Sequence, residues 1–321
     1  MKQISIEIIH KCPNNCLHCS SYSNINCSME IETNKVKEVI DSAVKLDTEV
    51  LSISGGEPFL HEGLLDIVEY AKLKGLKVYI YTSGININKK GKISCLSKDI
   101  LINLHNNGVD KIIFDLPAID EKIYDSFMGT NGYQQFAFQS IADTKKAGIY
   151  TEIHFVPTKI NLNQIDKILD YVEKNNINEI SFLGLIPHGR ALKNKQKLYL
   201  DEADNSRLKS RLKQIKQGNV RIGIPLQDLE SEYCCYAGIN KLCIRYDGKV
   251  FGCEAFKYID LVNDEGENVM PDTIYDFKLE DIYRNSEYLK AERKFINKQM
   301  KDCVCQEKCP VQRMIRKVSD F

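Results

Sequence analysis

The stretch CPNNCLHC, residues 12–19, places Cys12, Cys16 and Cys19 in the spacing C-x3-C-x2-C. It comes directly after the apolar stretch Ile4–Ile9, which predicts a β-strand. Three thiolates on one short loop can bind three irons of a [4Fe–4S] cluster and leave the fourth iron without a protein ligand. Such an open iron can bind a small molecule, as the open position of a catalytic zinc site does. The three cysteines are therefore the predicted metal-binding and catalytic residues.

A zinc site is the alternative interpretation of this loop. Structural zinc usually takes four ligands in paired C-x2–4-C spacing, and the loop supplies only three cysteines. The fourth ligand would have to be His10 or His18. The ligand count therefore favours an iron–sulfur cluster with an open position.

A second motif follows the apolar run 51–54, which predicts another strand. It reads Gly55-Gly56-Glu57-Pro58, and its two glycines allow a tight turn and a close approach of a ligand to the main chain. Together with the cysteine loop, this motif resembles the signature of the radical S-adenosylmethionine (SAM) superfamily. The resemblance implies that SAM binds the open iron through its amino and carboxylate groups, with the amino group received by the backbone of residues 55–58.

Size and composition narrow the class of protein. The 321 residues carry a formal net charge of +0, which leaves no electrostatic signature of nucleic-acid binding. No apolar run approaches the ~18 residues that a membrane-spanning helix needs, and no signal-peptide pattern precedes the first predicted strand. We therefore expect a cytoplasmic protein without a membrane partner. In that reducing compartment, 12 cysteines indicate metal sites rather than disulfides.

Strand and helix patterns alternate over the first ~200 residues, which predicts an α/β fold with parallel strands. The predicted strands are Ile4–Ile9, Val50–Ser54, Lys77–Thr82, Lys111–Asp115, Thr151–Val156 and Glu179–Leu183. The predicted helices are Thr33–Leu46, Gly63–Lys74, Ser97–Asn107, Tyr133–Ala147 and Asn163–Asn175, three of them closed by Gly75, Gly108 and Gly148. Six such units match the partial (β/α)6 barrel of TIM type that the resemblance implies. We expect this barrel over residues 1–200, a helical connector over 201–225 and a small cysteine-rich domain of β-hairpin and helix over 226–321.

Several predicted strand ends carry residues that the resemblance assigns to SAM. Tyr81-Thr82-Ser83-Gly84 resembles a Thr-Asn-Gly element of the family, which makes Thr82 and Ser83 cofactor-binding candidates. Asp115 lies where relatives contact the ribose, although its surroundings depart from their pattern. The alternative for Asp115 is a cap on the next turn.

Three further residues complete the predicted cofactor site. His18 occupies the position of an aromatic residue that lies near the adenine in the family, and Asn161 resembles a recurrent polar residue after the fifth strand. Arg190 belongs to a run that resembles a Pro-x-Gly-Arg element, and its guanidinium suits a carboxylate of SAM or of the substrate. A surface ion pair is the alternative role for Arg190.

A second set of cysteines occupies the last third of the chain. Asp247-Gly248 predicts a hairpin turn between two short apolar strands, with cysteines before and after it. The arrangement resembles the auxiliary-cluster domains called SPASM and Twitch, and seven cysteines are too few for two complete clusters. We therefore expect one auxiliary [4Fe–4S] cluster, with a zinc ribbon as the alternative. Its predicted ligands are Cys235, Cys253 and Cys309, with either Cys243 or Cys305 as the fourth; Cys234 is a possible hydrogen donor to a substrate radical.

The resemblance implies an enzyme that cleaves SAM reductively to a 5′-deoxyadenosyl radical for hydrogen abstraction. The leading hypothesis is modification of a ribosomally made peptide or a protein side chain, by a cross-link, a thioether or an epimerisation. A dehydrogenase or epimerase of a small molecule is the alternative, and a non-enzymatic iron–sulfur redox protein is less favoured. The implied partners are the substrate, an external one-electron reductant of flavodoxin or ferredoxin type, and a separate leader-peptide-binding protein, because the first strand begins at once.

Overall fold

A computed structural model describes residues 1–223, 226–227, 235–301, 309–311 and 314. Within these residues the largest sheet has nine strands in the order β11-β10-β1-β2-β3-β6-β7-β8-β9. In this order every neighbouring pair is parallel except the first, because β11 is antiparallel to β10. The strands are β1 Gln3–Ile9, β2 Val50–Gly55, β3 Lys77–Thr82, β6 Lys111–Asp115, β7 Thr151–Phe155, β8 Glu179–Phe182, β9 Val220–Ile222, β10 Lys241–Ile244 and β11 Val250–Phe251.

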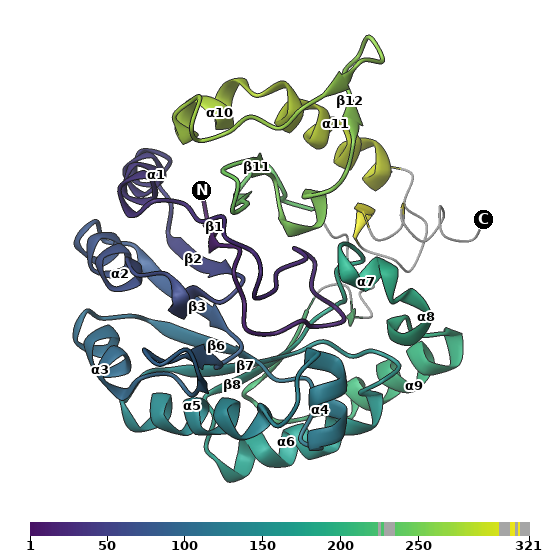
Figure 1. Ribbon diagram of the computed structural model, residues 1–321. Helices are drawn as coiled ribbons and strands as arrows, with labels where there is room; N and C mark the ends of the chain where they lie inside the picture. The colour runs from purple at the N-terminus through teal and green to yellow at the C-terminus, as the bar shows by residue number, and fades with distance from the viewer. Residues whose placement is uncertain (224–225, 228–234, 302–308, 312–313, 315–321) are drawn as a thin grey trace.

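Helices cover the outer side of this curved sheet, as the left and lower parts of Figure 1 show. The α/β fold class and its crossover helices are thus as the sequence predicts. The helices between successive strands are α1 Thr33–Lys45, α2 Leu64–Leu73, α3 Lys98–Asn106, α4 Glu121–Met128, α5 Gln134–Lys146 and α6 Ile165–Lys174. After β8 come α7 Arg190–Lys193, α8 Lys195–Leu198 and α9 Glu202–Lys213, and near the end α10 Leu279–Asn285 and α11 Glu287–Lys301.

Alternation of apolar and polar residues along the strands gives the sheet two different faces. In β1, Ile4, Ile6 and Ile8 are fully buried in the hydrophobic core, whereas Ser5 and Glu7 turn to the opposite face. The apolar face packs under the helices, and the inner face of the curved sheet is lined by polar side chains. A loop from the N-terminal part of the chain crosses the space inside the ring of elements in Figure 1.

Three features go beyond the predicted elements. β9 adds a parallel strand in the segment expected to be a connector, and α4 fills the gap after β6. The predicted hairpin forms as β10 and β11, but β10 pairs with β1, so the C-terminal segment extends the barrel sheet. The domain boundary at 226 remains a prediction, because 224–225 and 228–234 lie outside the described residues. Small strand pairs form from β4 Asn86–Ile87 with β5 Ile93–Ser94, and from β12 Leu261–Val262 with β13 Asn268–Val269.

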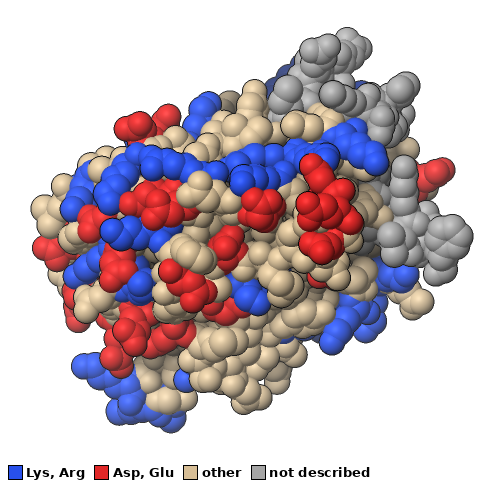
Figure 2. Space-filling view, turned by 90° about the horizontal axis from the view of Figure 1, so that it is seen from above, with Lys and Arg blue, Asp and Glu red and all other residues tan. Residues whose placement is uncertain are grey.

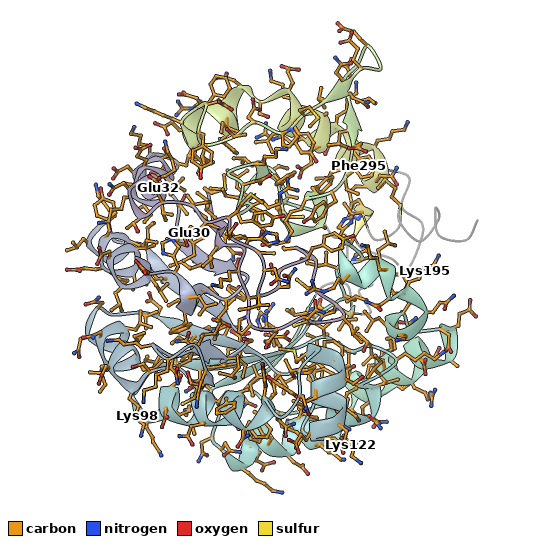
Figure 3. The ribbon with its side chains drawn as sticks, viewed as in Figure 1. Glu30, Glu32, Lys98, Lys122, Lys195 and Phe295 are labelled. Atoms are coloured by element: carbon orange, nitrogen blue, oxygen red, sulfur yellow. The ribbon has the colours of Figure 1, made fainter. Side chains whose placement is uncertain are left out.

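The surface carries both signs of charge. On the face in Figure 2, a band of Lys and Arg lies beside Asp and Glu side chains, in keeping with the net charge of +0. Lys98 and Lys122 point outward from the helical rim in Figure 3, while Phe295 on α11 points inward and meets Phe256 edge-on, with ring centroids 6.0 Å apart. Among the described residues, no helix is both long and apolar enough to cross a membrane.

Candidate functional site

The three-cysteine loop lies at the carboxyl end of β1, where a parallel barrel places its active site. Cys12 and Cys16 are buried and Cys19 is half-buried. Burial raises the pKa of the Cys12 and Cys16 thiols well above their usual range. Cys19 raises both values further, and Cys12 also acts on Cys16, so the three thiols lie close enough to interact electrostatically.

The donor set of this loop fits a [4Fe–4S] cluster. Within the described part of the chain, no three His, Cys, Asp or Glu side chains converge as ligands of a single ion. The thiolates of a [4Fe–4S] cluster do not converge on a single ion, because each thiolate binds its own iron. Asn14, between the first two cysteines, is buried, and both side-chain polar atoms lack a partner. Buried polar atoms are usually hydrogen-bonded, so we expect a polar group of a bound ligand next to the Asn14 amide.

Glycines from three segments of the chain pack against the backbone of this loop and of the strand before it. A Cβ atom on Gly56 would lie 2.2 Å from the Lys11 carbonyl oxygen, and one on Gly55 would lie 2.3 Å from that of Ile9. Gly129, which ends α4, and Gly189, which precedes α7, approach the carbonyl oxygens of residues 15 and 19 in the same way, at 2.3 and 2.5 Å. The loop is therefore held by direct backbone packing from β2, α4 and the segment after β8.

Glu57 connects the Gly-Gly-Glu-Pro motif to the end of β3. Its carboxylate, fully buried, accepts hydrogen bonds from the Thr82 hydroxyl at 2.6 Å and from the Ser83 hydroxyl and backbone N–H at 2.6 and 3.0 Å. Burial raises the pKa of Glu57, and these donors work against that shift. Pro58 opens the short 3₁₀ turn that Glu57 caps. The structure thus brings together four predicted cofactor residues: Glu57, Pro58, Thr82 and Ser83. The Glu57 carboxylate links the end of β2 to the end of β3.

His18 and Asp115 form the next pair of predicted residues that the structure joins. The His18 Nε2 atom lies 3.1 Å from Asp115 Oδ2, and the imidazole packs against Phe127 with ring centroids 4.6 Å apart. Both side chains are part-exposed beside the cysteine loop. The buried His18 Nδ1 atom has no partner. The pair is therefore available to a ligand that presents hydrogen-bonding groups here, as the ribose and adenine of SAM do.

Arg190 clamps the cysteine loop. Its Nε donates to the Cys16 carbonyl and its Nη2 to the Ser23 carbonyl, both at 2.7 Å, and its backbone N–H donates to the Cys19 carbonyl at 2.9 Å. Its charge also works against the burial that raises the pKa of Cys12 and Cys16. Among the described residues its guanidinium thus bonds backbone carbonyls of the loop rather than a surface carboxylate, which indicates a positioning role, and its contact with a carboxylate of SAM or of the substrate remains a prediction.

We expect Arg190→Lys to release iron about tenfold faster to a chelator under anaerobic conditions. A lysine ammonium cannot bind the Cys16 and Ser23 carbonyls in the fixed geometry of the guanidinium. Loss of a contact that orients a metal ligand typically costs about 10–100-fold in metal affinity. The matched control is Arg207→Lys, a change on α9 at an exposed arginine. Equal iron-release rates in both variants would contradict the clamping role.

Asn161 uses its side chain within the protein. Its Oδ1 accepts from the Thr158 backbone N–H and hydroxyl, at 2.7 and 2.9 Å, and its Nδ2 donates to the carbonyls of Pro117 and Val156, at 3.0 and 3.1 Å. An amide has two donor hydrogens and two acceptor lone pairs, so these four bonds fill it. This differs from the expected direct cofactor contact: the side chain fastens the loop after β7 to the loop after β6.

Cys309 of the second set acts electrostatically on two other cysteines of that set. Cys309 raises the pKa of both Cys235 and Cys253, after the larger effect of burial, which brings the pKa of Cys235 to about 11. Cys243 is buried on β10, opposite Ser5 of β1. Cys234 and Cys305 lie outside the described residues. The choice of Cys243 or Cys305 as fourth ligand therefore remains a prediction, as does the hydrogen-donor role of Cys234.

Glu292 of α11 supports the turn before Cys253. Its Oε2 accepts from the Gly252 N–H at 2.8 Å, and its Oε1 is buried without a partner. Burial raises the pKa of Glu292 to about 8, so the folded protein holds a proton that the unfolded chain releases near pH 4.5. Stability from this group is complete below pH 4.5 and is lost as the pH rises toward 8.

We expect Glu292→Gln to remove that pH dependence and to stabilise the apo-protein by a few kcal/mol at pH 8 relative to wild type (about 1.4 kcal/mol per pKa unit). Urea unfolding of both proteins at pH 5 and pH 8 measures the difference. If wild type and variant differed in free energy of unfolding by the same amount at pH 5 and at pH 8, Glu292 would not hold a buried proton.

A network of polar residues on the inner face of the sheet escaped the sequence analysis. Glu152 of β7 accepts from Lys111 at 2.7 Å, from His154 at 3.0 Å and from the Ser181 hydroxyl. Burial alone would raise the pKa of Glu152, but His154 and Lys111 lower it to about 2. His154 pairs in register with Asp115. The alternation of polar and apolar residues along β6, β7 and β8 was the signal that could have revealed this network.

A partial α/β barrel with a three-cysteine loop at its carboxyl end, buttressed by a glycine-rich turn, defines an iron–sulfur enzyme site. The family model described as "Radical SAM superfamily" matches residues 6–172, more than half of the chain. The chain belongs to the radical SAM superfamily and is an enzyme of that class. Its family implies a [4Fe–4S] cluster and SAM, and the residues described above fit both groups.

The curated relatives differ in function. An Fe-coproporphyrin III synthase of Methanosarcina barkeri is 27% identical over 184 residues, which are 57% of this chain and 44% of that protein. A probable GTP 3′,8-cyclase of Sulfurisphaera tokodaii is 22% identical over 266 residues, 79% of this chain and 81% of the relative. The match thus spans less than half of the first relative.

Solved structures with the same fold include Streptococcus suis SuiB bound to its precursor peptide SuiA. It superposes with a TM-score of 0.73 at 19% identity, over 91% of this chain and 66% of that one. Native anSMEcpe with bound AdoMet superposes with a TM-score of 0.66 at 14% identity, over 95% and 86%. At these identities the likeness concerns the fold alone.

Proposed function

We propose that this chain modifies a ribosomally made peptide or a protein side chain, by a cross-link, a thioether or an epimerisation. The observation that carries the proposal is the charge balance inside the barrel, where Lys111 and Glu179 begin β6 and β8 below the level of the cysteine loop. Lys111 lies 2.7 Å from both Glu152 and Glu179, and Arg221 of β9 lies 3.8 and 3.7 Å from the same carboxylates. Both described cations of this network are thus neutralised by carboxylates.

This barrel interior suits a peptide better than the nucleotide or the porphyrin that appears in the relatives' names. A nucleoside triphosphate calls for cations in excess to bind its phosphates, and a porphyrin buries a wide apolar surface. A peptide segment presents many hydrogen-bonding groups and little net charge. SuiB, whose structure holds a precursor peptide, and anSMEcpe, whose structure holds a peptide, offer further support because they share this fold.

In this proposal Cys12, Cys16 and Cys19 would hold a [4Fe–4S] cluster, and Gly55–Pro58 and the His18–Asp115 pair would hold SAM. When bound, these groups supply the homolytic chemistry that removes hydrogen from an unactivated C–H bond. Arg190 and the close-packed glycines keep the cysteine loop in place, and Glu57 holds the ends of β2 and β3 together. The inner-face network around His154 positions the substrate next to Asp115.

We further propose one auxiliary [4Fe–4S] cluster on Cys235, Cys253 and Cys309, with Cys243 or Cys305 as the fourth ligand. The effect of Cys309 on the pKa of both Cys235 and Cys253 supports a shared site. An external one-electron reductant of flavodoxin or ferredoxin type and a separate leader-peptide-binding protein are the partners that this function calls for.

The test is anaerobic reconstitution with iron, sulfide, SAM and dithionite, followed by mass spectrometry of 5′-deoxyadenosine. We expect short synthetic peptides to stimulate its formation more than a panel of amino sugars and polyols. Stimulation by the small molecules alone would replace the peptide substrate with the small-molecule alternative. Full iron loading without any binding of SAM would refute the enzymatic role of the site.

A further inference from the structure

A buried ion pair lies directly beneath the cysteine loop. The Lys257 ammonium donates to Glu7 Oε1 and to the Ser21 hydroxyl, both at 2.6 Å, and to the Ser20 hydroxyl at 3.1 Å. The Lys257 side chain is 1% exposed. Ser21 also donates to Glu7 at 2.6 Å, and the second carboxylate oxygen is buried without a partner. Both charges are therefore held rigidly in a medium of low dielectric constant.

This ion pair joins the two cysteine-bearing parts of the chain. Ser20 directly follows Cys19, whose thiol interacts electrostatically with Lys257. Lys257 itself ends the 3₁₀ turn Glu254–Phe256, which Cys253 precedes. A single lysine from the C-terminal segment thus places its charge at the end of the N-terminal cysteine loop.

Two further contacts fix the position of that lysine. Arg245 donates from Nη1 to the Lys257 carbonyl at 2.8 Å and binds Asp247 through Nε and Nη2. His188 Nε2 lies 2.5 Å from the Ala255 carbonyl, and burial lowers the pKa of His188, so the neutral ring donates this bond. The turn that carries Lys257 is therefore fastened to the hairpin on one side and to the segment after β8 on the other.

The charge of a nearby group shifts the reduction potential of an iron–sulfur cluster, because reduction adds negative charge to it. We propose that Lys257 and Glu7 together set the reduction potential of the N-terminal cluster, Lys257 favouring the reduced state and Glu7 opposing it. Lys257 acts as a positioning and electrostatic residue that the C-terminal segment supplies to the N-terminal cysteine loop. The inference rests on the proposed cluster at Cys12, Cys16 and Cys19.

The experiment is a redox titration of the reconstituted protein, followed by electron paramagnetic resonance. The signal that changes on adding SAM identifies the N-terminal cluster. We expect Glu7→Gln to raise its midpoint potential and Lys257→Met to lower it. Each change should alter the ratio of reduced to oxidised cluster at a fixed potential about tenfold, which is about 59 mV for one electron.

Opposite signs distinguish an electrostatic role from a structural one, since loosening of the loop would move both variants in the same direction. The double variant Glu7→Gln/Lys257→Met should fall between the two single ones and avoids a buried unpaired charge. Lys249→Met, on the neighbouring hairpin, is the control and should match wild type. Unchanged or same-direction shifts in the two single variants would overturn the inference, whereas a wild-type protein without any SAM-responsive signal would overturn the proposed cluster itself.

Discussion

Replacing Cys12, Cys16 and Cys19 together by alanine should reduce the SAM-dependent formation of 5′-deoxyadenosine at least about a hundredfold, to the background of reductant alone. We expect this result because the proposed N-terminal cluster takes all its protein ligands from these three thiolates, whereas loss of an outer-shell group typically costs about 10–100-fold. Iron content should fall while iron at the auxiliary cysteines is retained. Mass spectrometry of the nucleoside and colorimetric iron analysis measure the two effects.

Cys95→Ala is the matched control for this variant, because Cys95 follows the small strand β5 and lies outside both predicted ligand sets. It should keep wild-type iron and activity. Undiminished nucleoside formation in the triple variant would show that the cysteine loop does not initiate the reaction. Such a result would remove the basis of the proposed function.

The second large effect is expected for Gly56→Ala. The added Cβ would meet the Lys11 carbonyl oxygen at 2.2 Å and the His10 carbonyl oxygen at 2.5 Å, and both partners are backbone atoms that cannot rotate away. Overpacking typically costs about 1–3 kcal/mol, and we expect at least ~3 kcal/mol here because two segments of main chain must separate. Urea unfolding of the apo-protein measures the loss, and SAM-dependent activity should fall with it.

Gly218→Ala provides the control, because nothing lies within 4 Å of a Cβ at Gly218. Alanine there should be neutral or stabilise the protein by up to ~1 kcal/mol through the unfolded chain. Equal stability of the two alanine variants would show that the turn at Gly56 can move aside, and the close packing would then lose its role in holding the cysteine loop.

Local patterns were sufficient to predict the strands and helices of the α/β part, while the barrel itself was implied by the family resemblance. The six predicted strands and five predicted helices coincide with structural elements to within two residues at each end, since apolar periodicity and closing glycines are local signals. The helix α4 also had local signals that went unused. Asp120 caps its start by accepting from the N–H groups of residues 122 and 123, and Gly129 ends it with a positive φ of 65°.

Contacts between distant segments could not be read from the sequence. The pairing of β10 with β1 joins residues more than 230 positions apart, and a short apolar strand fits an isolated hairpin equally well. The ion pair of Glu7 with Lys257 spans a similar separation, and each residue alone is unremarkable in the sequence. Asn161 illustrates the opposite case: its position suggested a ligand contact, but its local hydrogen bonds already fill the amide.

The position of β1 between β2 and β10 also has a consequence for biosynthesis. During translation, β1 can pair with β2 early, yet its other edge waits until residues 241–244 leave the ribosome. At about 5–20 residues per second, that interval is roughly 10–50 s. A strand edge left bare for so long is a template for pairing with other chains. During this interval, binding of chaperones or early loading of iron onto the neighbouring cysteine loop would determine the yield of folded protein.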